Sequence, residues 1–269
     1  MDAIGLLAHG FIQRALIAGS CIAVLCSTLG VFLVLRRLSL IGDGLAHVTF
    51  GSVALGLLLK SYPFYVAVPV VMLSSLGILK LMEKARLYGD AAIGVVSSLG
   101  VAGGVLLASV AGGFNVDLFS YLFGSILSIS KAEVVVSAVL SLCLLAVILL
   151  LYQELFSITF DEEAARTSGV KTTLVNRILV LLTALTVVLA TKMVGVMLVS
   201  ALLILPPVTA LQMARGFRAM MVYSSCAGLL SVVLGIFISF AADLPTGAVI
   251  VLLNFLFFIA TFFAKRFRS

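Results

Sequence analysis

Charge is scarce in this sequence: only 10% of its 269 residues are Asp, Glu, Lys or Arg, whereas 63% are hydrophobic. A soluble globular domain carries about 25% charged and about 45–50% apolar residues, so the composition excludes that class. It also excludes an intrinsically disordered chain, which needs low hydrophobicity. The mean hydropathy of +1.31 indicates a chain that lies in a lipid bilayer.

Three motifs that carry chemistry are also missing. The four cysteines lie in apolar runs without a Cys-x-x-Cys spacing, which excludes a disulfide framework and a cysteine-based metal site. No Gly-Lys-Ser or Gly-Lys-Thr occurs, so the phosphate-binding loop of an ATPase is lacking. The His-Glu-x-x-His motif of a metalloprotease is also absent, so the sequence does not support an intramembrane protease. We therefore expect that the chain is not an enzyme and that any energy from ATP comes from a partner subunit.

What the sequence does contain is a series of long apolar segments. A helix needs about 20 mostly apolar residues to cross the hydrocarbon layer, and windows of that size predict an all-α, polytopic membrane protein with about nine transmembrane helices. We expect one domain over residues 1–269, without internal repeats. The predicted spans are 12–35, 43–60, 63–82, 91–111, 132–152, 173–191, 194–213, 219–240 and 246–264.

Two segments should depart from simple spans. Pro206 and Pro207 lie inside the seventh predicted span, where they should break the helix. The outer connection at about 112–131 is apolar but too short to cross the membrane. It predicts a helix that dips into the protein or lies at the interface, because unpaired backbone cannot face lipid.

The distribution of basic residues predicts the orientation. Of the 17 Lys and Arg, only Arg14, Lys60, Lys131 and Lys192 fall at one set of span ends, and the other 13 fall at the opposite set. Because Lys and Arg collect in cytoplasmic loops, we expect the C-terminus inside and the N-terminus outside. This distribution also explains the net charge of +6 without a nucleic-acid partner.

The sharpest local feature lies at the start of the second span. Asp43 and His47 stand four residues apart and so share one face of a helix. A carboxylate beside an imidazole suits a borderline divalent ion such as Zn²⁺, Mn²⁺ or Fe²⁺. A capping Asp beside an incidental His would show the same spacing, but ionisable residues inside a span usually mark an ion path. We predict a metal contact that needs further ligands, at a depth that the sequence leaves open.

Weaker signals come from other polar and small residues. Ser200, Asn254 and Asp117 are candidates for the ion pathway, although for each of them a role in capping a helix or bonding two helices together is the favoured interpretation. Gly100 and Gly104 have the spacing that lets helices pack closely.

A cytoplasmic connection at about 154–170 concentrates acidic residues and predicts a short helix. Thr159 or Asp161 can cap it, Glu162 and Glu163 would occupy its first turn, and Gly169 can end it.

Several of these segments resemble one family. The stretch Arg36-Arg-Leu-Ser-Leu-Ile-Gly-Asp-Gly-Leu-Ala-His47 resembles the signature of the membrane permeases of bacterial zinc/manganese/iron ABC importers. Residues 117–130, 194–206 and 243–247 are similar to later landmarks of the family, in the same order. Glu163-Ala-Ala-Arg-Thr-Ser-Gly169 is similar to the loop by which importer permeases dock on their ATPase. One departure is Phe50-Gly51-Ser52, where relatives commonly have Gly or Pro-Gly shortly after the His.

The resemblance implies a type II ABC importer-like permease in the bacterial cytoplasmic (inner) membrane. It implies a homodimer that works with two copies of an ABC ATPase and an extracytoplasmic metal-binding protein, and that has no permanently bound cofactor. The transported metal would be Zn²⁺ first, with Mn²⁺ or Fe²⁺ next. An ion-coupled secondary metal transporter without an ATPase is the alternative, but no inverted repeat supports it. The implied metal contacts are Asp43 and His47, and the implied ATPase-docking residues are Glu162, Glu163, Ala164, Ala165 and Gly169.

Overall fold

The structure is a computed structural model, which describes residues 10–110, 124, 130–196 and 198–266, and within these the regular secondary structure is entirely helical. The helices are α2 (Gly10–Leu35), α3 (Ile41–Leu58), α4 (Pro63–Lys84), α5 (Gly89–Val110), α7 (Lys131–Leu150), α8 (Tyr152–Phe160), α9 (Glu162–Thr167), α10 (Thr172–Val194), α11 (Val199–Met213), α12 (Phe217–Ala242) and α13 (Thr246–Arg266). Most of the predicted outer segment at 112–131 lies outside the described residues.

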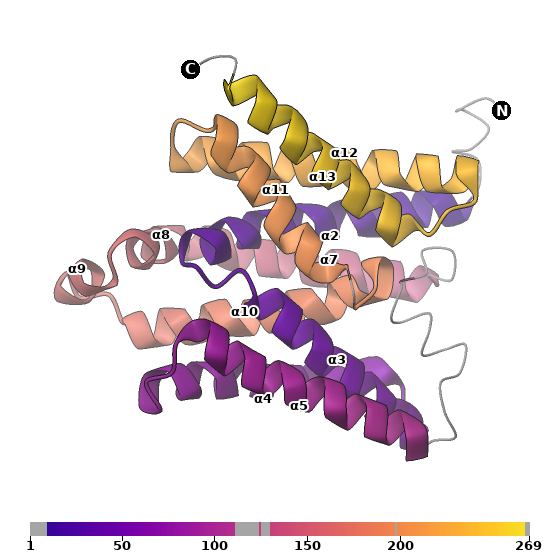
Figure 1. The fold of residues 1–269 in the computed structure, drawn as a ribbon, viewed down its shortest axis with the longest axis horizontal. Coiled ribbons are helices and arrows are strands. Elements are labelled where there is room, and N and C mark those ends of the chain that lie inside the picture. The colour runs from indigo at the N-terminus through magenta and orange to yellow at the C-terminus, as the bar shows by residue number, and fades with distance from the viewer. Residues whose placement is uncertain (1–9, 111–123, 125–129, 197, 267–269) are drawn as a thin grey trace.

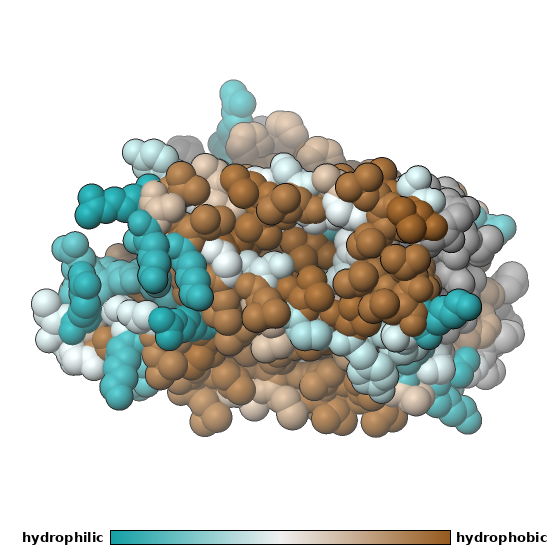
Figure 2. Space-filling view, turned by 90° about the horizontal axis from the view of Figure 1, so that it is seen from below, coloured by the Kyte–Doolittle hydropathy of each residue, from teal (hydrophilic) through white to brown (hydrophobic). Residues whose placement is uncertain are grey.

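The all-α membrane fold is confirmed. Eight of the described helices are long and apolar enough to cross a membrane, and the remaining predicted span, the seventh, corresponds to the shorter apolar helix α11. The long helices run roughly along the long axis of the molecule, and α8 and α9 project at one end of it (Figure 1). Hydrophilic side chains gather at the two ends and a broad apolar band lies between them, as expected for a protein surrounded by lipid (Figure 2).

The seventh predicted span begins later than expected, and its proline pair does not break it. α10 ends at Val194, Gly195 has a left-handed φ of 89°, and α11 starts only at Val199. Pro206 and Pro207 lie within the continuous helix α11. Pro207 has no N–H and so leaves the carbonyl of Leu203 without its helical hydrogen bond. The helix tolerates this because α2 packs directly against that carbonyl.

The residue of α2 at this contact is Gly30. A Cβ atom at Gly30 would lie 2.0 Å from the carbonyl oxygen of Leu203, four residues before Pro207, and 2.8 Å from the ring of Pro207. The freed carbonyl therefore faces the bare Cα of a glycine, an arrangement that permits a weak Cα–H···O contact. Close packing of α2 on α11 thus compensates for the missing backbone hydrogen bond.

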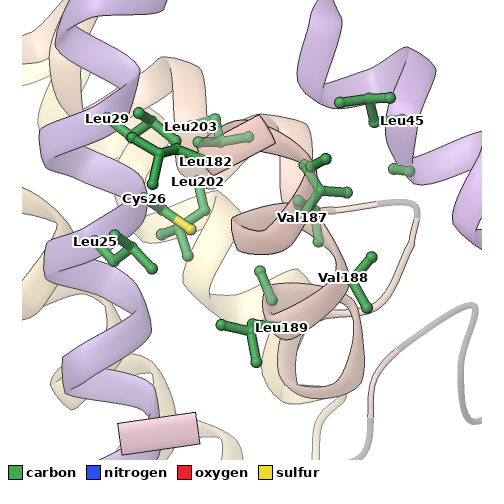
Figure 3. Packing of buried hydrophobic residues seen from close by; sticks show 14 of the residues in the cluster. Leu25, Cys26, Leu29, Leu45, Leu182, Val187, Val188, Leu189, Leu202 and Leu203 are labelled. Atoms are coloured by element: carbon green, nitrogen blue, oxygen red, sulfur yellow. The ribbon is translucent and has the colours of Figure 1, made fainter. Parts of the chain in front are cut away.

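The central layer of the molecule consists of α2, α3 and α10. About 70% of the residues in their apolar windows are buried in the chain, compared with 22–33% for the other candidate spans. Leu29 of α2 lies near Leu203 of α11 and Leu182 of α10 in this core (Figure 3). The peripheral helices instead expose apolar side chains, which lipid accommodates at no cost.

Helix α5 approaches α3 more closely than side chains would allow. A Cβ atom at Gly100 would lie 2.8 Å from the backbone N and Cα of Val48 and 2.9 Å from the carbonyl carbon of His47. The predicted close packing at Gly100 is confirmed. It fixes the distance between α5 and the segment of α3 that carries His47.

Candidate metal pathway and docking segment

The chain reverses sharply before it reaches Asp43. Beyond Leu35, Arg37 adopts a left-handed φ of 58° and the N–H of Leu38 donates to the carbonyl of Leu33 over 2.8 Å. Such a 6→1 bond ends a helix and turns the chain back. At 1.5 Å per residue, α2 is about 39 Å long and α3 only about 27 Å. The link after α2 runs back toward the middle, and α3 begins part-way along the long axis (Figure 1).

One open stripe runs along the first part of α3. Between residues 41 and 54, every residue is buried except Asp43, His47 and Gly51. Gly51 lies against α5, where a Cβ atom would be 2.6 Å from the carbonyl oxygen of Gly100, so the open stripe consists of Asp43 and His47. On the adjoining faces, Gly42 packs against Leu203 and Gly44 packs against Ile93. The polar side chains therefore lie on a face of this buried helix that the described part of the chain leaves uncovered.

The geometry of the two side chains suits a shared ion. The Nε2 atom of His47 and the Oδ2 atom of Asp43 lie 3.6 Å apart, which is longer than a normal hydrogen bond. Two ligand atoms about 2.1 Å from one tetrahedral ion would lie about 3.4 Å apart. Asp43 and His47 can thus bind one metal with little rearrangement, and their side chains are 47% and 25% exposed.

These two ligands do not make a complete site. Within the described part of the chain, no group of three or more His, Cys, Asp or Glu side chains is placed to hold a metal ion. Structural zinc sites use four protein ligands and catalytic ones three. A pair on an open stripe, completed by water or by another chain, can hold an ion briefly and release it.

The predicted docking segment forms two helices instead of one. α8 ends at Phe160, and Thr159 lies inside it, where its hydroxyl donates to the carbonyl of Leu155. Asp161 caps α9, because its carboxylate accepts a bond of 2.9 Å from the N–H of Ala164. Gly169 ends this helix with a φ of 91°.

The candidate docking residues on α9 differ in exposure. Glu163 and Ala164 are exposed, as is Gly169 after the helix. Ala165 is only 4% exposed and packs into the core of the chain itself. Glu162 is also exposed, at 44% of its side-chain surface, although both of its carboxylate oxygens bond within the chain.

Glu162 belongs to a ring of three polar side chains. The guanidinium of Arg36 donates from Nη1 to Asn176 over 2.6 Å and from Nη2 to Glu162 over 2.7 Å. The ring closes through Asn176, whose Nδ2 donates to the other carboxylate oxygen of Glu162 over 2.8 Å. It joins the end of α2, the first turn of α9 and the start of α10.

Aromatic side chains hold α8 in place beside the hydrogen-bonded ring of Arg36, Asn176 and Glu162. Phe156 meets Phe217 of α12 edge to face at a centroid distance of 5.0 Å, and Phe217 meets Phe32 of α2 at 5.3 Å. Such contacts add about 0.5–1.5 kcal/mol each beyond the area they bury. The α8 segment is thereby fixed to two long helices.

A second polar cluster lies at the other ends of the long helices. The hydroxyl of Tyr62 donates to the carboxylate of Glu133 over 2.5 Å, and Lys192 donates to both of these groups. Glu133 also completes a capping box with Ser130 at the start of α7. The cluster connects the ends of α4, α7 and α10.

The structure does not place the other three candidates for the ion pathway beside Asp43 and His47. Asn254 is 1% exposed and donates to the hydroxyl of Ser231 on α12 over 2.8 Å, which is a bond between helices. Ser200 is half-buried in the first turn of α11. Asp117 lies outside the described residues.

The sequence matches the ABC 3 transport family over residues 8–265. This chain belongs to that family. Its members with similar sequences include the manganese transport system membrane protein MntC of Halalkalibacterium halodurans, which is 32% identical over 97% of this chain and 90% of its own length. The high-affinity zinc uptake system membrane protein ZnuB of Haemophilus influenzae is 28% identical over 94% of this chain and 97% of its own length.

Solved structures of similar proteins agree with the family assignment. PsaBC from Streptococcus pneumoniae, solved in complex with a Fab, contains a chain with a TM-score of 0.86 and 32% identity. The match covers 96% of this chain and 93% of that one. A putative metal-chelate type ABC transporter in an inward-facing conformation shares the fold at a TM-score of 0.69 and 17% identity. The ABC permease fold inferred from the sequence is confirmed.

Sequence reasoning missed the two polar clusters. Arg36 enters the sequence analysis as a basic residue for the orientation and as part of the family signature, and Asn176, Tyr62 and Glu133 belong to no motif. Their partners lie from 59 to 140 residues away in the sequence, apart from the pair of Asn176 and Glu162. The only available signal was that Lys192 and Glu133 are charged residues at the ends of apolar spans, where a buried charge needs a partner.

Proposed function

We propose that this chain is the membrane permease subunit of an ATP-driven importer for divalent transition-metal ions, with Mn²⁺ and Zn²⁺ as the two candidate substrates. The observation that carries the proposal is the open stripe of α3, where Asp43 and His47 are spaced to share one ion. The names of its relatives support both metals: MntC is a manganese transport protein and ZnuB a zinc uptake protein.

The proposed unit is a homodimer with two ATPase subunits, in the bacterial cytoplasmic membrane. A metal-binding protein on the outer side would deliver the ion, which would pass between two copies of the permease. A second copy supplies a second Asp43–His47 pair, which brings the ligand number to four. The end of the molecule that carries α8 and α9 would face the cytoplasm together with the C-terminus, as the basic residues predict.

The ranking of the metals starts from the ligands. A carboxylate and an imidazole accept Mn²⁺ and Zn²⁺ alike, and Zn²⁺ binds such sites more tightly in the general affinity order. The family resemblance placed Zn²⁺ first, whereas the ligand types alone do not rank the two metals as substrates. Several relatives named for manganese, including ScaB of Streptococcus parasanguinis at 34% identity, bring Mn²⁺ to at least equal rank.

Uptake into proteoliposomes tests the proposal. The permease, reconstituted with its ATPase and binding protein, is expected to take up radiolabelled Mn²⁺ or Zn²⁺ only with ATP. Asp43→Ala and His47→Ala should each abolish uptake while the complex still assembles. Asp90→Ala is the matched control, because Asp90 is an exposed acid in the first turn of α5. Metal uptake driven by a proton gradient without ATP, or normal uptake by both site variants, would contradict the proposal.

A substitution at the site separates the two metals. Asp43→His replaces the hard oxygen ligand by a second imidazole, which favours Zn²⁺ over Mn²⁺. We expect Zn²⁺ to become the stronger competitor of Mn²⁺ uptake in this variant. Unchanged competition would place metal selection elsewhere, for example in the binding protein.

A further inference from the structure

The ring of Arg36, Glu162 and Asn176 joins the two functional parts of the chain. Arg36 follows α2 directly and begins the short link to α3, and Glu162 lies in the first turn of α9. The guanidinium uses two different nitrogens for its two partners, at 2.6 and 2.7 Å. A planar guanidinium can make both bonds at once, whereas the single ammonium of a lysine cannot reproduce the fork.

The side chains of Arg36, Glu162 and Glu163 differ in their surroundings. The side chain of Arg36 is 12% exposed, so its charge is largely removed from water and depends on its partners. Both carboxylate oxygens of Glu162 are engaged within the chain. Glu162 still exposes 44% of its side-chain surface, and Glu163, the next residue, is exposed as well. Neighbouring acids on α9 therefore have different surroundings: Glu162 is tied to the transmembrane helices and Glu163 is available to a partner subunit.

The link from Arg36 to the metal contacts is short and internally bonded. The N–H of Leu38 donates to Leu33, and the N–H of Ile41 donates to Leu38. Asp43 follows two residues later in the first turn of α3. These bonds stiffen the link, so that a displacement of Arg36 is passed on toward the start of α3.

A cavity provides room for such a displacement. It measures about 210 Å³ and is lined by Arg36, Glu162 and Asn176 on one side and by Leu38 and Ile41 on the other, among other residues. The cavity is partly open to the outside, so the ring and the first residue of α3 have room to move.

We propose that Arg36 is a positioning residue that transmits the movement of α9 to Asp43 and His47 through its bonds to Glu162 and Asn176. This inference rests on the proposed function, because an ATPase subunit must move α9. In the proposed cycle, the ATPase binds the exposed side of α9 and shifts it. Glu162 then pulls Arg36, and the bonded link changes the position of the metal contacts at the start of α3.

The test uses the whole importer in proteoliposomes and measures Mn²⁺ uptake per ATP hydrolysed, together with the amount of ATPase that co-purifies. Arg36→Lys keeps the charge but loses the fork. We expect the ATPase to remain bound and active while uptake per ATP falls roughly tenfold, within the usual range of coupling between sites. Arg37→Lys is the matched control, since Arg37 is the exposed neighbour of Arg36. A charge exchange, Arg36→Glu with Glu162→Arg, should restore part of the ratio that Arg36→Glu alone loses.

Each result decides the matter. An unchanged ratio in Arg36→Lys overturns the inference and leaves the proposed function standing. A fall in uptake that matches a loss of bound ATPase also overturns it, because Arg36 would then act by supporting the docking surface. No ATP-dependent uptake by the unaltered importer would overturn both proposals.

Discussion

Helix α5 carries glycines on two faces with opposite surroundings. At Gly100 an added Cβ atom would lie 2.8 Å from the backbone of Val48, whereas at Gly94 it would meet no atom within 4 Å. Both glycines belong to the same small-residue helix and look alike in the sequence. Only Gly100 sets the distance between α5 and α3. In a membrane helix, small size matters where another backbone lies against it and has no consequence elsewhere.

Adding a methyl group at the contact between α2 and α11 should cause the largest loss of stability. In Gly30→Ala, the new methyl group would lie 2.0 Å from the carbonyl oxygen of Leu203, so the two helices must separate. We expect a loss of about 3 kcal/mol or more, at the upper end for overpacked cores. The thermal unfolding midpoint of the purified protein in detergent measures it. A midpoint equal to that of the parent protein would contradict this reading of the contact.

Gly100→Ala should show an intermediate effect, with Gly94→Ala as the matched control on the same helix. The methyl group at position 100 would press on Val48 and on the carbonyl carbon of His47. We expect a loss of about 1–3 kcal/mol in stability, together with weaker metal uptake because His47 shifts.

In Gly94→Ala the methyl group meets open space, and alanine is the better helix former by up to about 1 kcal/mol. Stability should therefore be retained or slightly increased. Equal losses in both α5 variants would show that helix flexibility, and not the contact with α3, explains the glycines. Unfolding midpoints and uptake assays on the three proteins give the answer.

The smallest effect is expected where a hydrogen bond, and not close backbone contact, joins two helices. Asn254 of α13 donates to Ser231 of α12 in a buried position. Bonds of this kind between membrane helices average about 0.6 kcal/mol. Asn254→Ala and Ser231→Ala should each lower the unfolding midpoint slightly, and the double variant should lower it by less than the sum. Additive losses would mean that the bond contributes nothing to stability.

The sequence predicted the spans well because lipid imposes a simple requirement on them. A run of about 20 apolar residues has few alternatives to a helix in a bilayer, and the predicted ranges agree with the observed ones to within a few residues at most ends. The exception is α11, where Pro206 and Pro207 were expected to break the helix. The helix stays continuous because Gly30 of α2 packs against Leu203 and Pro207. No local sequence pattern predicts this contact, because Gly30 lies far away along the chain.

The candidate site was predicted in part for the same reason. Asp43 and His47 stand out because ionisable residues are rare inside spans, and their spacing of four places them on one face. Their depth could not be predicted, because it depends on how the chain reverses at Arg37 and where α3 then starts. The role of Glu162 could not be predicted either, since its partner Arg36 lies 126 residues earlier.

The sequence by itself determined the class of protein, the number and limits of most helices, the shared helix face of Asp43 and His47, and the family. These follow from composition and short spacings, which act within one helix. Tertiary structure alone decided which glycines are in contact, which face of α3 stays open, and that Glu162 bonds to Arg36 and Asn176. The reason is that a bilayer dictates helices locally, whereas the packing of one helix on another depends on shape and on polar partners far apart along the chain.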